Sequence, residues 1–240
     1  MKSRQFYLLA IFLFFTLYSS YAQVSQGGLP WSLENHYAIK SASIAEFPDA
    51  PETWEMDLIE NMGDEMKPFL FAWPVDTSLN ILDARNRIYS DNLTDIYQLV
   101  VRNRTAHSIN LIFSQYHLPE GAELYLFNPD YTVIRGSYTK SNNKDYRKLA
   151  TTPVPGNQIV IELVVDKTKM DFEPELELGR VSFDMKDVFG EKAGHFGRSG
   201  DCNVDINCPA GAEWQLEKHS VAKFIRGGSF LCSGALINNT

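Results

Sequence analysis

The sequence predicts a mainly β protein whose central domain is an antiparallel β-sandwich. Short runs rich in Ile, Val, Leu, Tyr and Phe recur at fairly even spacing between residues 95 and 183. Turn-forming Pro, Gly, Asn and Asp residues separate these runs. Short strands with regularly spaced turns are typical of an antiparallel sandwich, which we favour over a closed barrel built from the same pattern.

Six strands are expected in this domain. They cover residues 96–102, 108–115, 123–127, 132–138, 158–165 and 176–183. The tripeptide Asn128-Pro129-Asp130 is a strong turn signal between the third and fourth strands. Apolar side chains that alternate along a strand face one side of a sheet. We therefore expect a core that includes Phe113, Leu124, Leu126, Ile161 and Leu163.

The segment from residue 23 to about residue 80 is less regular. Four prolines interrupt it, which argues against long helices. One short helix is expected, beginning at Thr53, running through Met62 and ending at Gly63.

The N-terminus has the pattern of a secretory signal peptide. Lys2 and Arg4 precede an almost wholly apolar run at residues 6–18, and small residues follow at the positions that a signal peptidase reads. We expect cleavage between Ala22 and Gln23 and export of the rest. A membrane anchor is the alternative, but the apolar run is shorter than the roughly 20 residues that span a bilayer.

Charge and composition exclude two classes of partner. The formal net charge is −8 and the isoelectric point is near 5.1. Binding to nucleic acid or to an anionic membrane needs clustered Lys and Arg, which this sequence lacks. After the leader, no segment is apolar and long enough to cross a membrane.

The cysteines divide the chain into two parts. Residues 23–190 contain no cysteine, whereas Cys202, Cys208 and Cys232 follow within the last part. Because export favours disulfides and three is an odd number, at least one cysteine has a partner outside this chain or stays free. We predict four regions: a signal peptide (1–22), a β-rich domain (23–190), a glycine-rich processing linker (191–200) and the start of a second domain (201–240).

No catalytic, cofactor-binding or metal-binding residue is predicted. The alternating acidic and amide residues from Asp201 to Asn207 resemble a calcium loop, but Ile206 stands where that loop needs glycine. Ser199-Gly200-Asp201 has the wrong order for a serine nucleophile motif. The five histidines show no metal-ligand spacing. A helical or irregular piece at 213–222 and a strand at 230–237 complete the chain.

Two segments carry a family resemblance. The run from Ser199 to Pro209 and the run from Cys232 to Thr240 are similar to the start of the mature chain in bacterial lysyl endopeptidases and their secreted trypsin-fold relatives. Weaker similarity to the pro-region of that family lies at 118–122, 142–144 and 152–156. The chain thus resembles a signal peptide, a pro-region and the first segment of a trypsin-like double β-barrel.

The resemblance implies roles for several residues. Cys202, Cys208 and Cys232 would each pair with a cysteine further downstream. The catalytic His, Asp and Ser would lie beyond Thr240, so this piece would be inactive. The family's mature chain begins after a lysine, whereas here the equivalent start, Gly197, follows Phe196, and Lys192 is nearby. These three residues are the candidate maturation sites.

Physical size gives one more expectation. A piece as short as residues 197–240 cannot bury a core without disulfide partners. We expect it to pack poorly or to borrow an edge of the preceding domain.

Two functions are consistent with the sequence. The first is a precursor of a secreted serine endopeptidase that cleaves protein substrates through an acyl-enzyme without a cofactor. The alternative is a secreted β-sandwich that binds glycans or proteins. A third, weaker hypothesis is that the chain is an autonomous protease inhibitor. Cleavage specificity, the inhibitory or folding role of the pro-region and oligomeric state stay open.

Overall fold

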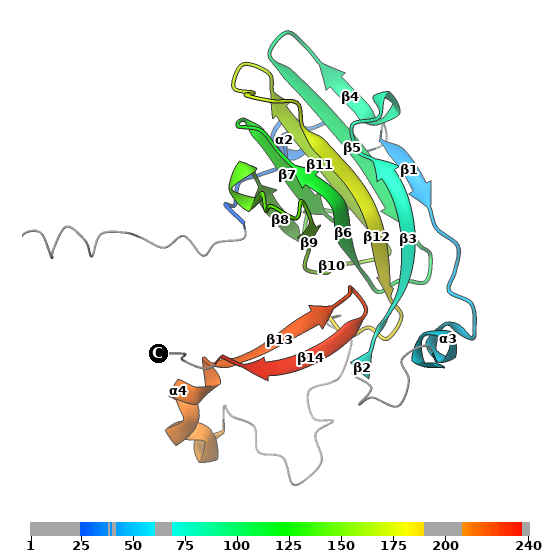
Figure 1. The fold of residues 1–240 in the computed structure, drawn as a ribbon, viewed down its shortest axis with the longest axis vertical. Coiled ribbons are helices and arrows are strands. Elements are labelled where there is room, and N and C mark those ends of the chain that lie inside the picture. Colours follow the sequence, from blue (N-terminus) through cyan, green and yellow to red (C-terminus); the bar gives the residue numbers. More distant parts are fainter. Residues whose placement is uncertain (1–24, 38, 40–41, 61–68, 190–207, 237–240) are drawn as a thin grey trace, which may run out of the picture.

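A computed structural model describes residues 25–37, 39, 42–60, 69–189 and 208–236 (Figure 1). The predicted signal peptide, the linker and Cys202 lie outside these ranges. The described residues form three sheets, and none of the sheets closes into a barrel. The prediction of a mainly β fold with antiparallel sheets is confirmed.

The first sheet, called the β11 sheet, has the strand order β1-β5-β11-β7-β8, with β4 also pairing with β5. Strand β1 runs parallel to β5, and the other pairs are antiparallel. Its strands are β1 (Ser43–Glu46), β4 (Arg87–Ser90), β5 (Thr94–Arg102), β7 (Ala122–Phe127), β8 (Ile134–Tyr138) and β11 (Gln158–Asp166).

The second sheet, called the β12 sheet, has the order β10-β6-β12-β3, and β9 also pairs with β6. All of its pairs are antiparallel. Its strands are β3 (Ala72–Asn80), β6 (Ser108–His117), β9 (Leu149–Ala150), β10 (Val154–Pro155) and β12 (Glu175–Asp184).

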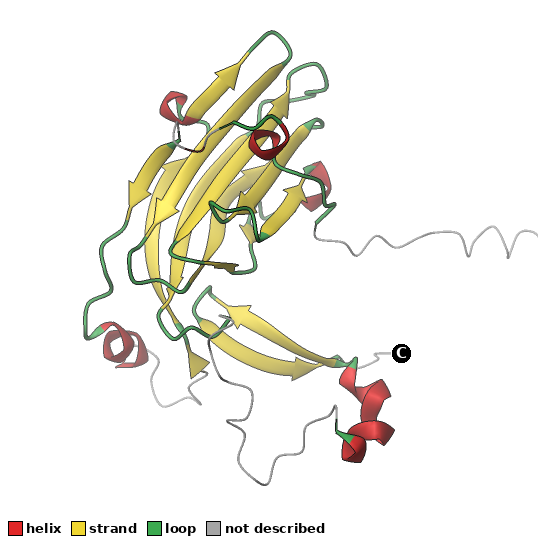
Figure 2. Ribbon diagram, turned by 180° about the vertical axis from the view of Figure 1, so that it is seen from behind, coloured by secondary structure: helices red, strands yellow, loops and turns green. Residues whose placement is uncertain are grey.

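The third sheet contains β2 (Phe69–Leu70), β13 (Val221–Arg226) and β14 (Phe230–Ala235), in the order β13-β14-β2. Strands β13 and β14 form the C-terminal hairpin, which lies at one end of the two larger sheets in both views (Figures 1 and 2). Short helices complete the fold: α2 (Trp31–Glu34), η2 (Ala84–Asn86), η3 (Lys140–Asn142), α3 (Trp54–Glu60), η4 (Pro209–Trp214) and α4 (Gln215–Lys218).

One core joins the two larger sheets. It takes apolar side chains from β5, β7 and β11 on one side and from β6 and β12 on the other. The five predicted core residues all belong to it, and each is completely buried: Phe113, Leu124, Leu126, Ile161 and Leu163. Two sheets that share a core in this way form a sandwich, so this prediction is also confirmed.

Several predicted boundaries shift for local reasons. The strand expected at 132–138 begins at Ile134, because the side chains of Asn128 and Asp130 bind the backbone N–H groups of Val133 and Thr132. The described part of the predicted helix after Thr53 is α3, and its expected end at Gly63 lies outside the described residues. Of the piece at 213–222, the last two residues belong to β13 rather than to a helix.

Strand β3 was not predicted, because Pro74 interrupts its sequence. Proline lacks the N–H group that a central strand needs for pairing on both sides. In the structure β3 pairs with β12 alone and forms an edge of the β12 sheet. An edge strand tolerates proline since one side of it makes no ladder hydrogen bonds.

The N-terminal segment covers the β11 sheet. Gln26 and Gly27 donate backbone hydrogen bonds to Ser137 and Gly136 of β8 at 3.0 Å each. Helix α2 then lies over Glu162 of β11, which is fully buried. This carboxylate accepts from the backbone N–H of Ser32 at 3.2 Å and from Nε2 of Gln98 at 2.6 Å. It satisfies one of the N–H groups that a helix start leaves without a partner.

Glu162→Ala is expected to destabilise the protein by about 2–4 kcal/mol, because it opens a cavity and leaves the Ser32 N–H and the Gln98 amide unpaired. Glu162→Gln should cost less than half of that. Its carbonyl can still accept from Ser32, and Gln98 can rotate its Oε1, which has no hydrogen-bond partner among the described residues, toward the new amide.

Urea unfolding measures both free energies, with Glu173→Ala, just before strand β12, as the exposed control. The control is expected to change the free energy of unfolding by less than about 0.5 kcal/mol. If Glu162→Ala is as mild as the control, the buried carboxylate does not anchor the N-terminal segment.

Candidate functional site

The C-terminal hairpin joins the sandwich through strand pairing. Phe230 and Leu231 of β14 pair with Leu70 and Phe69 of β2, which leads directly into β3. The carbonyl oxygen of Ser229 accepts from the backbone N–H groups of Phe71 at 3.0 Å and Ala72 at 3.4 Å. Of the two expected outcomes, poor packing or a borrowed strand, the structure has the hairpin paired with β2, a two-residue strand that belongs to neither larger sheet.

The turn of the hairpin rests on the outer face of the β12 sheet. Gly227 and Gly228 connect β13 to β14, and both have positive φ angles of +60° and +82°. A Cβ atom built on Gly228 would lie 2.5 Å from Oγ of Ser182 and 3.2 Å from Nδ2 of Asn110. Ser182 and Asn110 are buried and stand opposite each other on β12 and β6. The turn thus approaches the sheet more closely than a residue with a side chain could.

An ion pair stands beside this turn. Arg180 of β12 donates from Nε and Nη2 to the two carboxylate oxygens of Asp76 at 2.6 and 3.1 Å. Its Nη1 also donates to the carbonyl oxygen of Gly227 at 3.4 Å. The hydrogen bond from Arg180 lowers the pKa of Asp76 below its ordinary value of 3.8. The same bond raises the pKa of Arg180.

We call this set of contacts the docking site: β2 with Phe71, and Asn110, Arg180 and Ser182 of the β12 sheet. The rest of the hairpin contacts the sandwich less closely. A groove of about 630 Å³ separates them on one side, lined by Arg135, Ala150, Thr151, Thr152, Pro153, Pro155, Phe189, Lys223, Phe224, Ile225 and Leu231. Side chains along β13 are mostly exposed. The hairpin is therefore held mainly at its turn and at the start of β14.

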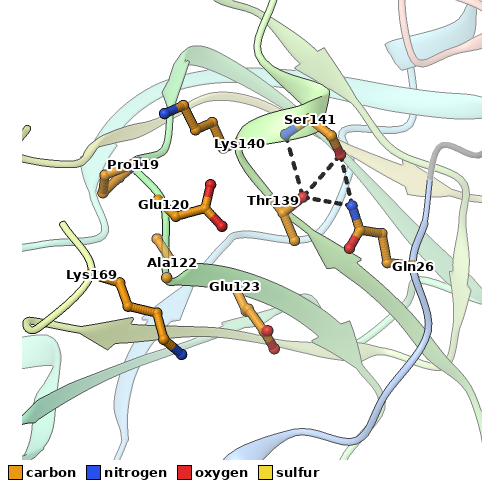
Figure 3. Close-up of a pocket in the computed structure, with 10 residues that line it drawn as sticks. Gln26, Pro119, Glu120, Ala122, Glu123, Thr139, Lys140, Ser141 and Lys169 are labelled. Carbon is orange, nitrogen blue, oxygen red and sulfur yellow. Dashed lines mark hydrogen bonds between the residues drawn. The ribbon is translucent and has the colours of Figure 1, made fainter. Parts of the chain in front are cut away.

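A second, polar cleft of about 410 Å³ lies on the sandwich itself (Figure 3). The Gln26 amide donates to the hydroxyls of Thr139 and Ser141 at 3.0 and 2.9 Å on one side of it. On the other side, Lys140 and Lys169 pair with Asp171 and Asp166 at 2.6 and 2.9 Å. The side chains of Gln26, Thr139 and Ser141 bond to one another, whereas the two lysines bond to residues outside the lining. The described lining residues contain no hydrogen-bonded pair of nucleophile and base.

Two neighbouring pairs among the described residues superficially resemble parts of a catalytic triad. Ser108 donates to Asp184 at 3.0 Å, and His107 lies 4.0 Å from Asp187. However, Ser108 is buried, and Asp184 also accepts from the backbone N–H groups of Lys186 and Val188. This carboxylate orders the turn after β12 rather than activating a nucleophile. Within the described ranges, no three His, Cys, Asp or Glu side chains gather to hold a metal ion.

The residues singled out in the sequence are spread over described and undescribed parts. Cys208 is exposed and Cys232 is partly buried on β14, and neither forms a disulfide with another described residue. Ala22, Gln23, Lys192, Phe196, Gly197 and Cys202 lie outside the described residues. The cleavage sites and the pairing of the cysteines with downstream partners thus stay predictions.

The docking residues were not predicted from the sequence. Gly227-Gly228 between two apolar runs is a hairpin signal that could have located the turn. Asn110 and Ser182 carry no such signal, because their meeting depends on the register between β6 and β12.

Comparison with known families finds a match to the last part of the chain. The family model described as the C-terminal domain of lysyl endopeptidase matches residues 196–240. This segment includes the hairpin and all three cysteines. In the part of the chain that the structure describes, no helix is long and apolar enough to cross a membrane.

The match agrees with the resemblance in family and corrects it in one respect. The sequence pattern assigned this chain to the N-terminal part of the enzyme as a whole. The matched description instead assigns residues 196–240 to a C-terminal domain. The relation to lysyl endopeptidase thus rests on these residues, and the β-sandwich lies outside the match.

The ion pair at the docking site should make stability depend on pH in the acid range. Because the pKa of Asp76 is lowered in the folded state, its contribution is complete above about pH 5 and disappears as the pH falls through the lowered pKa. The side chain of Asp76 is 73% exposed, so we expect a contribution of at most about 1 kcal/mol.

Urea unfolding of the wild type and of Asp76→Asn at pH 6 and at pH 2 checks this. The difference in stability between the two proteins should be smaller at pH 2 than at pH 6. A difference that stays the same at both pH values would show that charge on Asp76 does not contribute.

Proposed function

We propose that this chain is part of the precursor of a secreted serine endopeptidase related to lysyl endopeptidase. In this proposal the β-sandwich is a pro-region, and residues after the linker belong to the peptidase domain that follows it. The observation that carries the proposal is the family match at 196–240. The pairing of β14 with β2 supports it, because a pro-region needs a physical contact with the domain that it serves.

The parent enzyme would cleave peptide bonds of protein substrates through an acyl-enzyme. Such chemistry needs a serine, a histidine base and an aspartate in one geometry, together with donors for the oxyanion. We place these residues after Thr240. The buried Ser108 and its partner Asp184 offer no substitute, so the chain of 240 residues is proposed to be inactive by itself.

The docking site suggests what the pro-region does. Among the described residues, the hairpin packs against little of the protein. Side chains along β13 are mostly exposed, and Cys232 on β14 is only partly buried. Contact with β2 and with the β12 sheet holds this hairpin in an ordered form. The pro-region would keep the hairpin folded until the remainder of the peptidase domain covers it. Cleavage at Lys192 or at Phe196-Gly197 would then separate the two parts.

A binding module is the second candidate, and the polar cleft around Thr139 and Lys140 is the feature that favours it (Figure 3). Its hydroxyl, amide and carboxylate groups would suit a polar ligand such as a glycan. The two functions differ in what they require downstream of the sandwich.

Reading the source gene past the codon for Thr240 tests the precursor assignment directly. We expect the frame to continue into a segment with the catalytic histidine, a later aspartate and a serine in a Gly-rich motif, and cysteines for Cys202, Cys208 and Cys232. A stop codon at this point would overturn the assignment and leave the binding module. A matched test of the chemistry is the full-length protein with its downstream serine changed to alanine, which should lose all peptidase activity.

Export predicts a defined N-terminus. When the gene is expressed in a secreting host, mass spectrometry of the exported protein should show a chain that begins at Gln23. Ala22→Arg should block this cleavage, because the peptidase requires a small residue there. An exported protein that still carries residues 1–22 would contradict the signal peptide.

A further inference from the structure

The strand pairing at the docking site cannot by itself select a partner. Backbone groups form the contacts between β14 and β2, and any unpaired strand offers the same groups. In strand addition, affinity comes from the main chain, whereas specificity comes from pockets for side chains or from steric exclusion. A selective contact must therefore lie beside the paired strands.

The turn of the hairpin provides such a contact. Gly228 is buried and Gly227 is exposed, although both have positive φ angles. A Cβ atom at position 228 would come within 2.5 Å of Oγ of Ser182, whereas one at position 227 would have its nearest neighbour, Nη1 of Arg180, at 4.0 Å. Of the two glycines, Gly228 alone is excluded from carrying a side chain by the sandwich.

The pocket around Gly228 has a floor and a rim. Ser182 and Asn110 form the floor from adjacent strands. Arg180 forms the rim. Its Nε and Nη2 bind the carboxylate of Asp76, and in this orientation its Nη1 donates to the carbonyl oxygen of Gly227. Next to the pocket, Phe71 and Ala72 bind the carbonyl of Ser229. Contacts thus reach three successive residues of the turn.

Ser182 in the floor gives the seated turn no hydrogen bond. The hydroxyls of Ser182 and Ser229 are buried and have no hydrogen-bond partner among the described residues. A buried hydroxyl without a partner is unfavourable, so the seated turn gains little from the floor itself. Whether a turn can bind here therefore depends on the space between position 228 and Ser182 and on the hydrogen bonds to the carbonyl groups of Gly227 and Ser229.

We propose that Asn110, Ser182 and Arg180 form a recognition pocket for a glycine turn, and that this pocket decides which hairpin the sandwich accepts. Its partner is a β-hairpin with glycine at the buried turn position and free carbonyl groups on either side. The identification of this hairpin as part of the peptidase rests on the proposed function. The pocket itself does not, because it is defined by contacts of the turn with Asn110, Ser182 and Arg180 and by the Asp76 carboxylate that holds Arg180.

Amide hydrogen exchange in the full chain of 240 residues tests the pocket. The reporter is the Phe71 amide, which is protected by its bond to Ser229, and the amides of β11 report on the sandwich core. The variants are Gly228→Ala, the matched control Gly227→Ala in the same turn, Ser182→Ala, and the double variant Ser182→Ala/Gly228→Ala. Positive φ strains alanine at either glycine.

Gly228→Ala should lower the protection of Phe71 at least tenfold more than Gly227→Ala does. Removing the Ser182 hydroxyl should restore most of this loss in the double variant, because the strain at position 228 is the same in both backgrounds and only the clearance changes. Equal effects of the two glycine variants, or no recovery in the double variant, would overturn the proposal.

Ser182→Thr tests the pocket without any change in the turn. Its added methyl group should lower protection of Phe71 at least fivefold, with the β11 amides unchanged. Unchanged protection of Phe71 would count against the pocket even if Gly228→Ala fails to fold. The gene reading beyond Thr240 bears on the peptidase assignment alone, so failure of one proposal is distinguishable from failure of the other.

Discussion

The need to pair main-chain groups at the edges of the sheets is the constraint on which the rest of the structure depends. An open edge presents unpaired N–H and C=O groups that attract other strands. The structure meets this need in three ways. Gln26 and Gly27 cover β8 at one edge of the β11 sheet. Pro74 reduces the pairing capacity of β3 at an edge of the β12 sheet, and β2, just before it, takes the C-terminal hairpin.

The same constraint explains which parts of the fold could be predicted. Between residues 95 and 183 the strands have neighbours and a shared core, so that their apolar residues repeat regularly and Phe113 and Ile161 could be placed correctly. Two strands outside this region, β3 and β13, do not show this pattern. Pro74 disguised β3, and the exposed positions of β13 lack the alternation that identifies a half-buried strand. The local sequence therefore identifies a strand best where the side chains on one of its faces pack on the shared core.

The docking site shows a further limit of the sequence. Size alone predicted that the C-terminal piece needs an edge, but not which edge. Asn110 and Ser182 are separated by more than 70 positions, and a shift of one residue between β6 and β12 would turn one of them into the core. Register of this kind is a property of the whole sandwich. Gly227-Gly228, by contrast, is a local signal and could have been recognised.

The N-terminal segment has a consequence for the order of events during synthesis. Ser32 and Glu162 are 130 residues apart in the chain, and Gln26 binds Ser141 across 115 residues. Because a chain is synthesised from its N-terminus, the segment that is made earliest has to wait for partners that are made much later. Contacts so distant in sequence slow folding. Until residue 162 has emerged, the Ser32 N–H and the Gln98 amide lack the carboxylate that they bind, so helix α2 cannot take its final place on the β11 sheet.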